Sequence, residues 1–214
     1  MLDQLSQLIH SLYDLPALVK TGGYLVMAAI IFAETGLFVG FFLPGDSLLV
    51  TAGIFAAKGD LDIVFLNFLL MAAAIVGDFV SYSIGKRAGK FLFERRDSLI
   101  FRRSHLLRAK AFYDRHGGKA IFLARFVPVV RTFAPVVAGA MEMPYRRFAV
   151  FNISGAIAWV ATMTLLGYYL GTKIPDIERN IYFVVAIVVL LSFLPAVYEY
   201  WKERKAHTPR QEGL

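Results

Sequence analysis

The chain has 214 residues, of which 57% are hydrophobic and only 18% are charged, and its mean hydropathy is +0.58. Soluble domains are typically about 45–50% apolar and about 25% charged. This composition excludes a disordered chain and disfavours a soluble domain, because a chain of this length cannot bury so much apolar surface. The formal net charge is +7. With no cysteine and four scattered histidines, we expect no metal and no other cofactor.

The first part of the chain predicts an interfacial helix followed by a broken apolar region. Residues 1–20 are weakly amphipathic, which favours a helix lying on the membrane surface. Glu34 and Asp46 then separate three uncharged runs, Thr21–Ala33, Thr35–Gly45 and Ser47–Ala57. Each run is shorter than the about 20 apolar residues that a spanning helix needs. Pro44 and Gly45 break the helix, so we expect a re-entrant hairpin. Alternatively, Gly22–Phe42 spans fully and reverses the side of the N-terminus.

A spanning helix and a basic loop follow. Ile63–Ile84 is apolar apart from Asp78 and predicts a spanning helix. The linker 86–119 contains eleven Lys or Arg and three acidic residues, with a short helix expected between Ser104 and Gly117. Excess Lys and Arg in a short loop is typical of the cytoplasmic side of a membrane protein. We therefore interpret the positive charge as topology and expect no nucleic-acid partner.

The second half repeats this order. Ala120–Met141 is apolar but contains Arg125 and Arg131, and two prolines, Pro128 and Pro135, favour a second hairpin. Phe148–Thr172 carries no charge and predicts a second spanning helix, and Asn180–Tyr198 predicts another. The basic tail 201–214 is expected in the cytoplasm.

Weak internal similarity relates the two halves. The turn Phe42-Leu43-Pro44 parallels Phe126-Val127-Pro128, and Ala52-Gly53 parallels Ala138-Gly139. Because the two hairpins enter from opposite sides in this topology, the sequence predicts an all-α polytopic membrane protein, an inverted repeat with two opposed re-entrant hairpins plus spanning helices. The expected divisions are a transport domain (21–175, halves about 22–90 and 117–175), a C-terminal spanning helix (176–200) and the tail (201–214).

Four charged residues in the apolar stretches are the candidate site: Glu34, Asp46, Arg125 and Arg131. A charge at the bilayer centre costs about 2.5–3.5 kcal/mol on insertion scales, so none of them should face lipid. Arginine binds phosphate oxygens through a planar fork, and a buried carboxylate can carry a proton. The competing interpretation is that the arginines and acids only form ion pairs that hold the hairpins together. Asp78 fits an ordinary position near the interface, and Trp159 fits packing.

The quoted residues occur within a wider set of motifs that resembles the bacterial DedA family, also called the SNARE-associated or VTT-domain family. The motifs are Glu34-Thr-Gly, Pro44-Gly45-Asp46, Gly85-Lys86-Arg87-x-Gly89, Arg125-Phe126-x-Pro128-x-x-Arg131, Ala138-Gly139, Met143, Phe148 and Asn152-x-x-Gly155. The resemblance runs from about Gly22 to Gly171. It implies an inner-membrane protein with two opposed re-entrant hairpins, linked to recycling of undecaprenyl phosphate and to the proton-motive force, with the four charged residues at essential positions.

Several functions remain open. The favoured hypothesis is a polyprenyl-phosphate flippase in which Arg125 and Arg131 bind the phosphate and Glu34 and Asp46 sense or carry protons. A proton-coupled exporter of small cations or osmolytes, a general phospholipid scramblase and a passive scaffold are the alternatives. We expect no enzymatic activity, because no histidine lies in the apolar core of the second hairpin. The expected partners are a lipid-phosphate substrate, membrane lipids and protons, and a homo-oligomer is left open.

Overall fold

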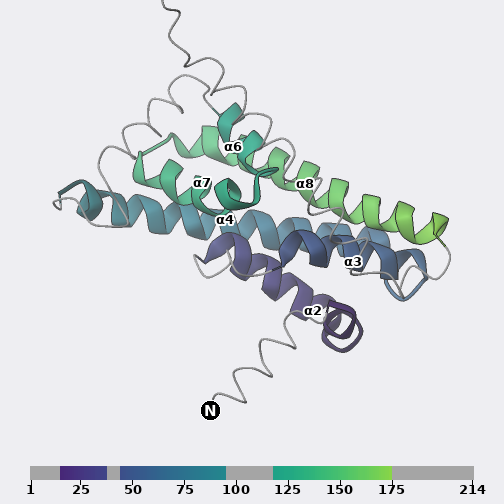
Figure 1. Cartoon of the computed structure of the whole chain (residues 1–214). Coiled ribbons are helices and arrows are strands. Elements are labelled where there is room, and N and C mark those ends of the chain that lie inside the picture. Colours follow the sequence, from purple (N-terminus) through teal and green to yellow (C-terminus); the bar gives the residue numbers. More distant parts are fainter. Residues whose placement is uncertain (1–14, 38–43, 95–117, 175–214) are drawn as a thin grey trace, which may run out of the picture.

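The computed structural model describes residues 15–37, 44–94 and 118–174 (Figure 1). Within these ranges the chain is helical and has no strand, which confirms the expected all-α class. The helices are α2 (Leu15–Gly36), α3 (Gly45–Ala57), α4 (Ile63–Glu94), α6 (Lys119–Ala124), α7 (Pro128–Ala140) and α8 (Tyr145–Lys173). The start of the interfacial helix, the linker helix between Ser104 and Gly117, and the C-terminal segments 176–200 and 201–214 lie outside the described residues.

Three of the described helices are long and apolar enough to cross a membrane. They are α2, the first 27 residues of α4 and the whole of α8. The spanning segments expected at Ile63–Ile84 and Phe148–Thr172 lie within α4 and α8, which confirms them as apolar helices of spanning length. The helix α2 has 22 residues, with a non-helical backbone at Gly23 (φ 55°, ψ −155°).

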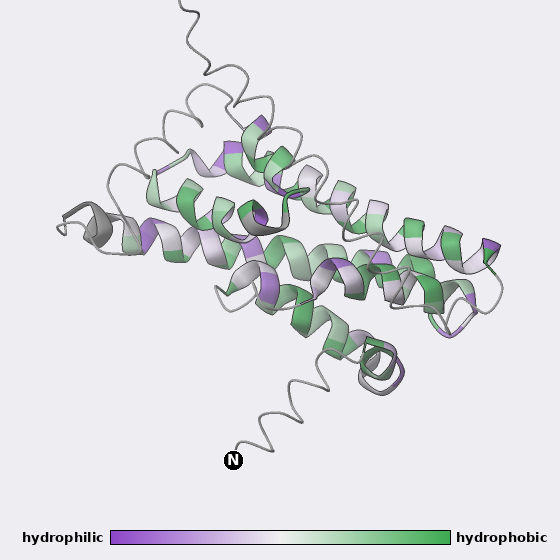
Figure 2. Ribbon diagram, viewed as in Figure 1, coloured by the Kyte–Doolittle hydropathy of each residue, from purple (hydrophilic) through white to green (hydrophobic). Residues whose placement is uncertain are grey.

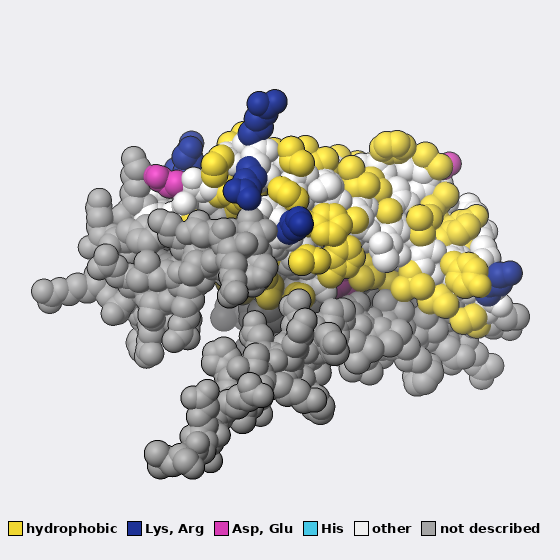
Figure 3. All heavy atoms as spheres, turned by 90° about the horizontal axis from the view of Figure 1, so that it is seen from above, with side chains coloured by type: hydrophobic (Ala, Val, Ile, Leu, Met, Phe, Trp, Pro, Cys, Tyr) yellow, Lys and Arg dark blue, Asp and Glu magenta, His cyan; other side chains and the backbone are white. Residues whose placement is uncertain are grey.

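Large apolar side chains remain exposed on these long helices, as a lipid solvent requires. Leu25 is 80% exposed and Phe68 71%, on α2 and α4 respectively. Figure 2 shows the long helices as mainly hydrophobic, and Figure 3 shows one face on which apolar side chains predominate among the described residues. Water would penalise so much exposed apolar surface, whereas lipid does not.

The two short helices begin at the proline-containing breaks. Pro44 directly precedes α3 and Pro128 is the first residue of α7. Proline suits a helix start, because its missing N–H has no intrahelical partner there. Both helices have 13 residues, or about 20 Å at 1.5 Å per residue, which is too short to cross a bilayer. The break expected at Pro135 is absent, since α7 continues through this residue.

Each short helix packs closely against a long helix from the other half of the chain. A Cβ atom at Gly53 of α3 would overlap the carbonyl oxygen of Thr164 on α8, and one at Gly167 would overlap that of Val50. The same reciprocal pattern joins α7 to α4. There, a Cβ at Gly139 would overlap the Tyr82 carbonyl, and one at Gly85 that of Val136. Glycine is needed at these crossings because the backbones touch.

The long helices α4 and α8 run antiparallel through the molecule (Figure 1). Near one end, the Thr164 hydroxyl donates to Asn67 Oδ1 at 2.8 Å. Nearer the other end, Asn152 Nδ2 donates to the Ile75 carbonyl at 3.4 Å. With α3 and α7 packed on this pair, the starts of both short helices come together in the interior, where the charged residues lie.

Candidate functional site

Arg131 joins three helices at the centre of the site. It lies in the first turn of α7, and its Nη1 donates to Asp46 Oδ1 at 2.6 Å, at the start of α3. Its Nη2 donates to Glu34 Oε1, two residues before the end of α2. All three side chains are buried: Glu34 is 2% exposed, Arg131 5% and Asp46 9%. The proline breaks make this possible, because they put a helix end beside each of these residues.

Trp159 of α8 completes this cluster. Its indole Nε1 donates to the same Asp46 oxygen at 2.7 Å. The Arg131 guanidinium carbon lies 4.2 Å from the centre of the indole ring, a cation–π contact. Sequence reasoning assigned Trp159 to packing, since a tryptophan on an apolar helix carries no signal of a polar partner. In the structure, it orients both ions.

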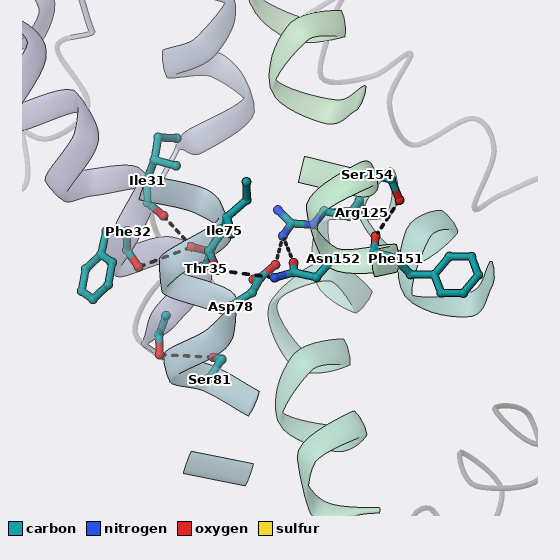
Figure 4. A network of polar contacts seen from close by, with 11 residues as sticks. Ile31, Phe32, Thr35, Ile75, Asp78, Ser81, Arg125, Phe151, Asn152 and Ser154 are labelled. Atoms are coloured by element: carbon teal, nitrogen blue, oxygen red, sulfur yellow. Dashed lines mark hydrogen bonds and ion pairs between the residues drawn. The ribbon is translucent and has the colours of Figure 1, made fainter. Parts of the chain in front are cut away.

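Arg125 forms a second centre instead of joining the first. It follows α6, and its Nη2 is paired with the Asp78 carboxylate of α4 and donates to Asn152 Oδ1 of α8 at 2.5 Å (Figure 4). Its guanidinium carbon lies 5.9 Å from the Trp159 ring centre, so this indole is within cation–π range of both arginines. Asp78 is 1% exposed. Asp78 therefore has a buried ionic partner that sequence reasoning missed, and the available signal was an acidic residue within a spanning helix.

Small residues allow the helices around these ions to approach. A Cβ at Gly45 would overlap the Glu34 carboxylate. Where α2 meets α4, a Cβ at Gly36 would lie 3.1 Å from the Cα of Gly77, and the Ser81 hydroxyl donates to the Gly36 carbonyl at 3.2 Å. Figure 4 shows Ser81 and Asp78 on one helix, with Arg125 reaching Asp78 from the side. The glycines thus bring the carboxylates within reach of the arginines.

The charges do not cancel across the two centres. Two arginines face three carboxylates, so the fully ionised cluster has a formal charge of 2 − 3 = −1. Arg131 Nε and Arg125 Nη1 are buried and have no hydrogen-bond partner among the described residues. An unpaired buried donor is costly, and an added acceptor that reached either nitrogen would remove that cost. By charge alone, the ionised cluster favours a cation, and neutralising a carboxylate would make it more favourable for an anion.

Comparisons with known proteins relate this chain to one group of membrane proteins. The family model of the VTT domain matches residues 43–169. Protein DedA of Escherichia coli (strain K12) is 48% identical over 185 residues, 86% of this chain and 84% of the relative. An uncharacterized membrane protein of Mycobacterium leprae is 40% identical over 80% of this chain and 77% of its own length. Inner membrane protein YghB of E. coli is 38% identical over 73% and 71%. No solved structure matches significantly.

Proposed function

This chain belongs to the DedA family of VTT-domain membrane proteins, and from that premise we propose that it is a transporter that moves a polyprenyl phosphate across the bacterial inner membrane. Undecaprenyl phosphate, returned for reuse as a carrier lipid, is the proposed substrate. The relative YghB is an inner membrane protein by name, which supports the proposed location. The resemblance of the motifs to the DedA family supports undecaprenyl phosphate as the substrate.

The observation that carries the proposal is the burial of two arginines that keep unpaired N–H groups among the described residues. Arg125 and Arg131 are 3% and 5% exposed, and each has one nitrogen with no hydrogen-bond partner in the described part of the chain. Arginine is the side chain best suited to bind a phosphate through two parallel hydrogen bonds. The exposed apolar surface of α4 and α8 would let a prenyl tail stay in lipid while its phosphate enters the site.

We further propose that the chain is an inverted repeat whose two short helices are re-entrant hairpin arms. The reciprocal glycine crossings support this, since α3 meets α8 as α7 meets α4. The equivalent positions are Gly53 and Gly139, and Gly167 and Gly85. Transporters built this way place the substrate site at the interface of the repeats, at broken helices near the bilayer midplane. Rocking of one half against the other would then expose the arginines to alternate sides.

Protons are the proposed coupling ion. A phosphate entering the ionised cluster would add negative charge to a site that already carries −1. In a low-dielectric interior this repulsion is large. Protonation of a carboxylate removes it, so lipid phosphate and proton would bind together. Glu34 and Asp46 are the carboxylates proposed to carry this proton, because both contact Arg131.

The test is a transport assay with purified protein in liposomes. Fluorescent short-chain polyprenyl phosphate and, separately, a fluorescent phospholipid are followed by their accessibility from outside, with and without a pH gradient. We expect movement of the polyprenyl phosphate alone, faster with a gradient and lost in Arg131→Ala. The matched control is Arg147→Ala, which removes an exposed arginine from α8 and should retain transport.

Other outcomes favour other functions. Equal movement of both lipids would make the protein a scramblase. If neither lipid moves and a small cation is exported in a proton-linked way, the exporter is favoured. Glu34→Gln should then abolish that export, because the surplus carboxylate of the site would bind the cation. Unchanged lipid transport by folded Arg131→Ala would remove the assigned role of Arg131. Release of phosphate from the lipid would overturn the proposal that the protein is not an enzyme.

A further inference from the structure

The two carboxylates that bind Arg131 are held in different ways. Asp46 Oδ1 accepts hydrogen bonds from two side chains, Arg131 Nη1 at 2.6 Å and Trp159 Nε1 at 2.7 Å. Glu34 accepts only from Arg131, through Oε1, and its Oε2 is buried with no hydrogen-bond partner among the described residues. Asp46 therefore has a fixed place in the cluster, whereas Glu34 is retained by a single side chain.

The unpartnered oxygen of Glu34 lies at the start of α3. A Cβ at Gly45, the first residue of α3, would overlap Oε2, so the carboxylate rests against the backbone of the first turn. The N-cap residue, Pro44, makes no side-chain capping hydrogen bond. A helix start carries unpaired N–H groups and the positive end of the helix dipole, and it is a favourable place for a phosphate oxygen. Glu34 thus places a negative group between an arginine fork and a helix start.

We propose that the Glu34 carboxylate is an internal substitute for the substrate phosphate, which must leave Arg131 and the start of α3 before a lipid phosphate can bind there. This inference rests on the proposed function and adds that Glu34 leaves Arg131 before the lipid phosphate binds. The ionisable groups that contact Glu34 or its partner are Arg131 from α7 and Asp46 from α3. The Arg125–Asp78 pair is the next nearest, because Arg125 lies near the same Trp159 ring as Arg131. Displaced from Arg131, Glu34 takes up a proton from water, and the phosphate takes its place at Arg131 and beside the start of α3.

The first experiment compares two variants of equal chemical change, Glu34→Gln and Asp46→Asn. Both are made in a Trp201→Phe background, which leaves Trp159 as the single tryptophan because the chain contains two. Purified full-length protein in detergent is titrated with farnesyl phosphate at pH 7.5 while Trp159 fluorescence is recorded, with farnesol as the control without phosphate. Glu34→Gln should bind farnesyl phosphate about tenfold more tightly than the parent, since it loses a charged competitor worth at least about 1.4 kcal/mol. Asp46→Asn should gain nothing.

A second experiment uses the unaltered protein and does not depend on variant folding. Calorimetric titration in buffers of different ionisation enthalpy counts the protons taken up when farnesyl phosphate binds. We expect uptake of about one proton per lipid at pH 7.5, because the displaced carboxylate becomes neutral. Folded Glu34→Gln should take up none.

The outcomes separate this inference from the proposed function. If the parent binds farnesyl phosphate but Glu34→Gln binds it equally or more weakly, or if the parent takes up no proton, Glu34 is not the competitor and the phosphate site stands. If Asp46→Asn gains affinity as Glu34→Gln does, the distinction between the carboxylates is wrong. If neither parent nor variants distinguish farnesyl phosphate from farnesol, both proposals fail.

Discussion

At the scale of single residues, the site depends on how five buried charges are shared. Arg131 takes two acids, while Arg125 has Asp78 and the amide of Asn152. Removing one member of a buried ion pair leaves an uncompensated charge, which is far more damaging than removing both. Asp78 is therefore as much a part of the site as the acids that contact Arg131.

The variant Asp78→Asn should lower the free energy of unfolding by about 3–5 kcal/mol, because it leaves Arg125 buried without its counter-ion. The double variant Asp78→Asn with Arg125→Gln should recover part of this loss, since no unpaired charge remains. Thermal unfolding of detergent-purified protein measures both, with exposed Asp60→Asn as the control. A melting temperature of Asp78→Asn equal to that of the parent would show that the ion pair contributes little.

At the scale of elements, the two short helices are positioned by glycines on the long ones. Gly85 and Gly89 of α4 contact α7, and Gly167 and Gly171 of α8 contact α3, each pair with the small-xxx-small spacing of close helix contacts in membranes. Without a hydrophobic driving force between helices in lipid, such close packing contributes much of the association. The same contacts place Asp46 and Arg131 at the starts of the short helices.

Gly85→Leu and Gly167→Leu should each prevent stable folding, because a side chain at either site meets the backbone carbonyl of Val136 or Val50 and the helix must move away. Overpacking typically costs about 1–3 kcal/mol, and backbone contact makes relief by a side-chain rotation impossible here. The measurement is the yield of monodisperse protein on size-exclusion chromatography. Ser83→Leu, on the exposed side of α4, is the matched control and should behave as the parent. Normal yields of both glycine variants would contradict the packing role.

At the scale of the whole molecule, the charged residues near the ends of the long helices predict how the protein is oriented across the membrane. The connection between α3 and α4 carries exposed Lys58 and Asp60, whereas exposed Arg146 and Arg147 lie at the start of α8. Excess Lys and Arg in the linker 86–119 predicts that its end of α4 is cytoplasmic. Because α4 and α8 are antiparallel, Arg146 should lie on this same side and Asp60 on the other.

Cysteine labelling tests this topology directly, because the natural chain contains no cysteine. In intact spheroplasts, Asp60→Cys should react with a membrane-impermeant maleimide, whereas Arg146→Cys should react only after the membrane is opened. Labelling after permeabilisation shows in each case that the residue is accessible at all. The reverse pattern would invert the topology, and labelling of both in intact spheroplasts would contradict a crossing between them.

Much of the architecture follows from composition and local pattern. A helix in lipid must be long, apolar and internally hydrogen-bonded, so α4 and α8 are predictable from uncharged runs alone. Pro44 and Pro128 likewise predict the starts of α3 and α7, because proline favours the first turn. Pro135 is the exception, since α7 continues through it.

The sequence by itself determined that this is an all-α membrane protein and that Glu34, Asp46, Arg125 and Arg131 need an explanation, because a charge in an apolar run is expensive wherever the helix packs. Only the tertiary structure decided which charges meet. Helices that are apolar on nearly all sides carry no periodicity that fixes their rotation, so nothing local assigns Asp78 to Arg125 or Trp159 to Asp46. Those partners are set by tertiary packing, which brings the end of α6 beside α4 and the start of α3 beside α8.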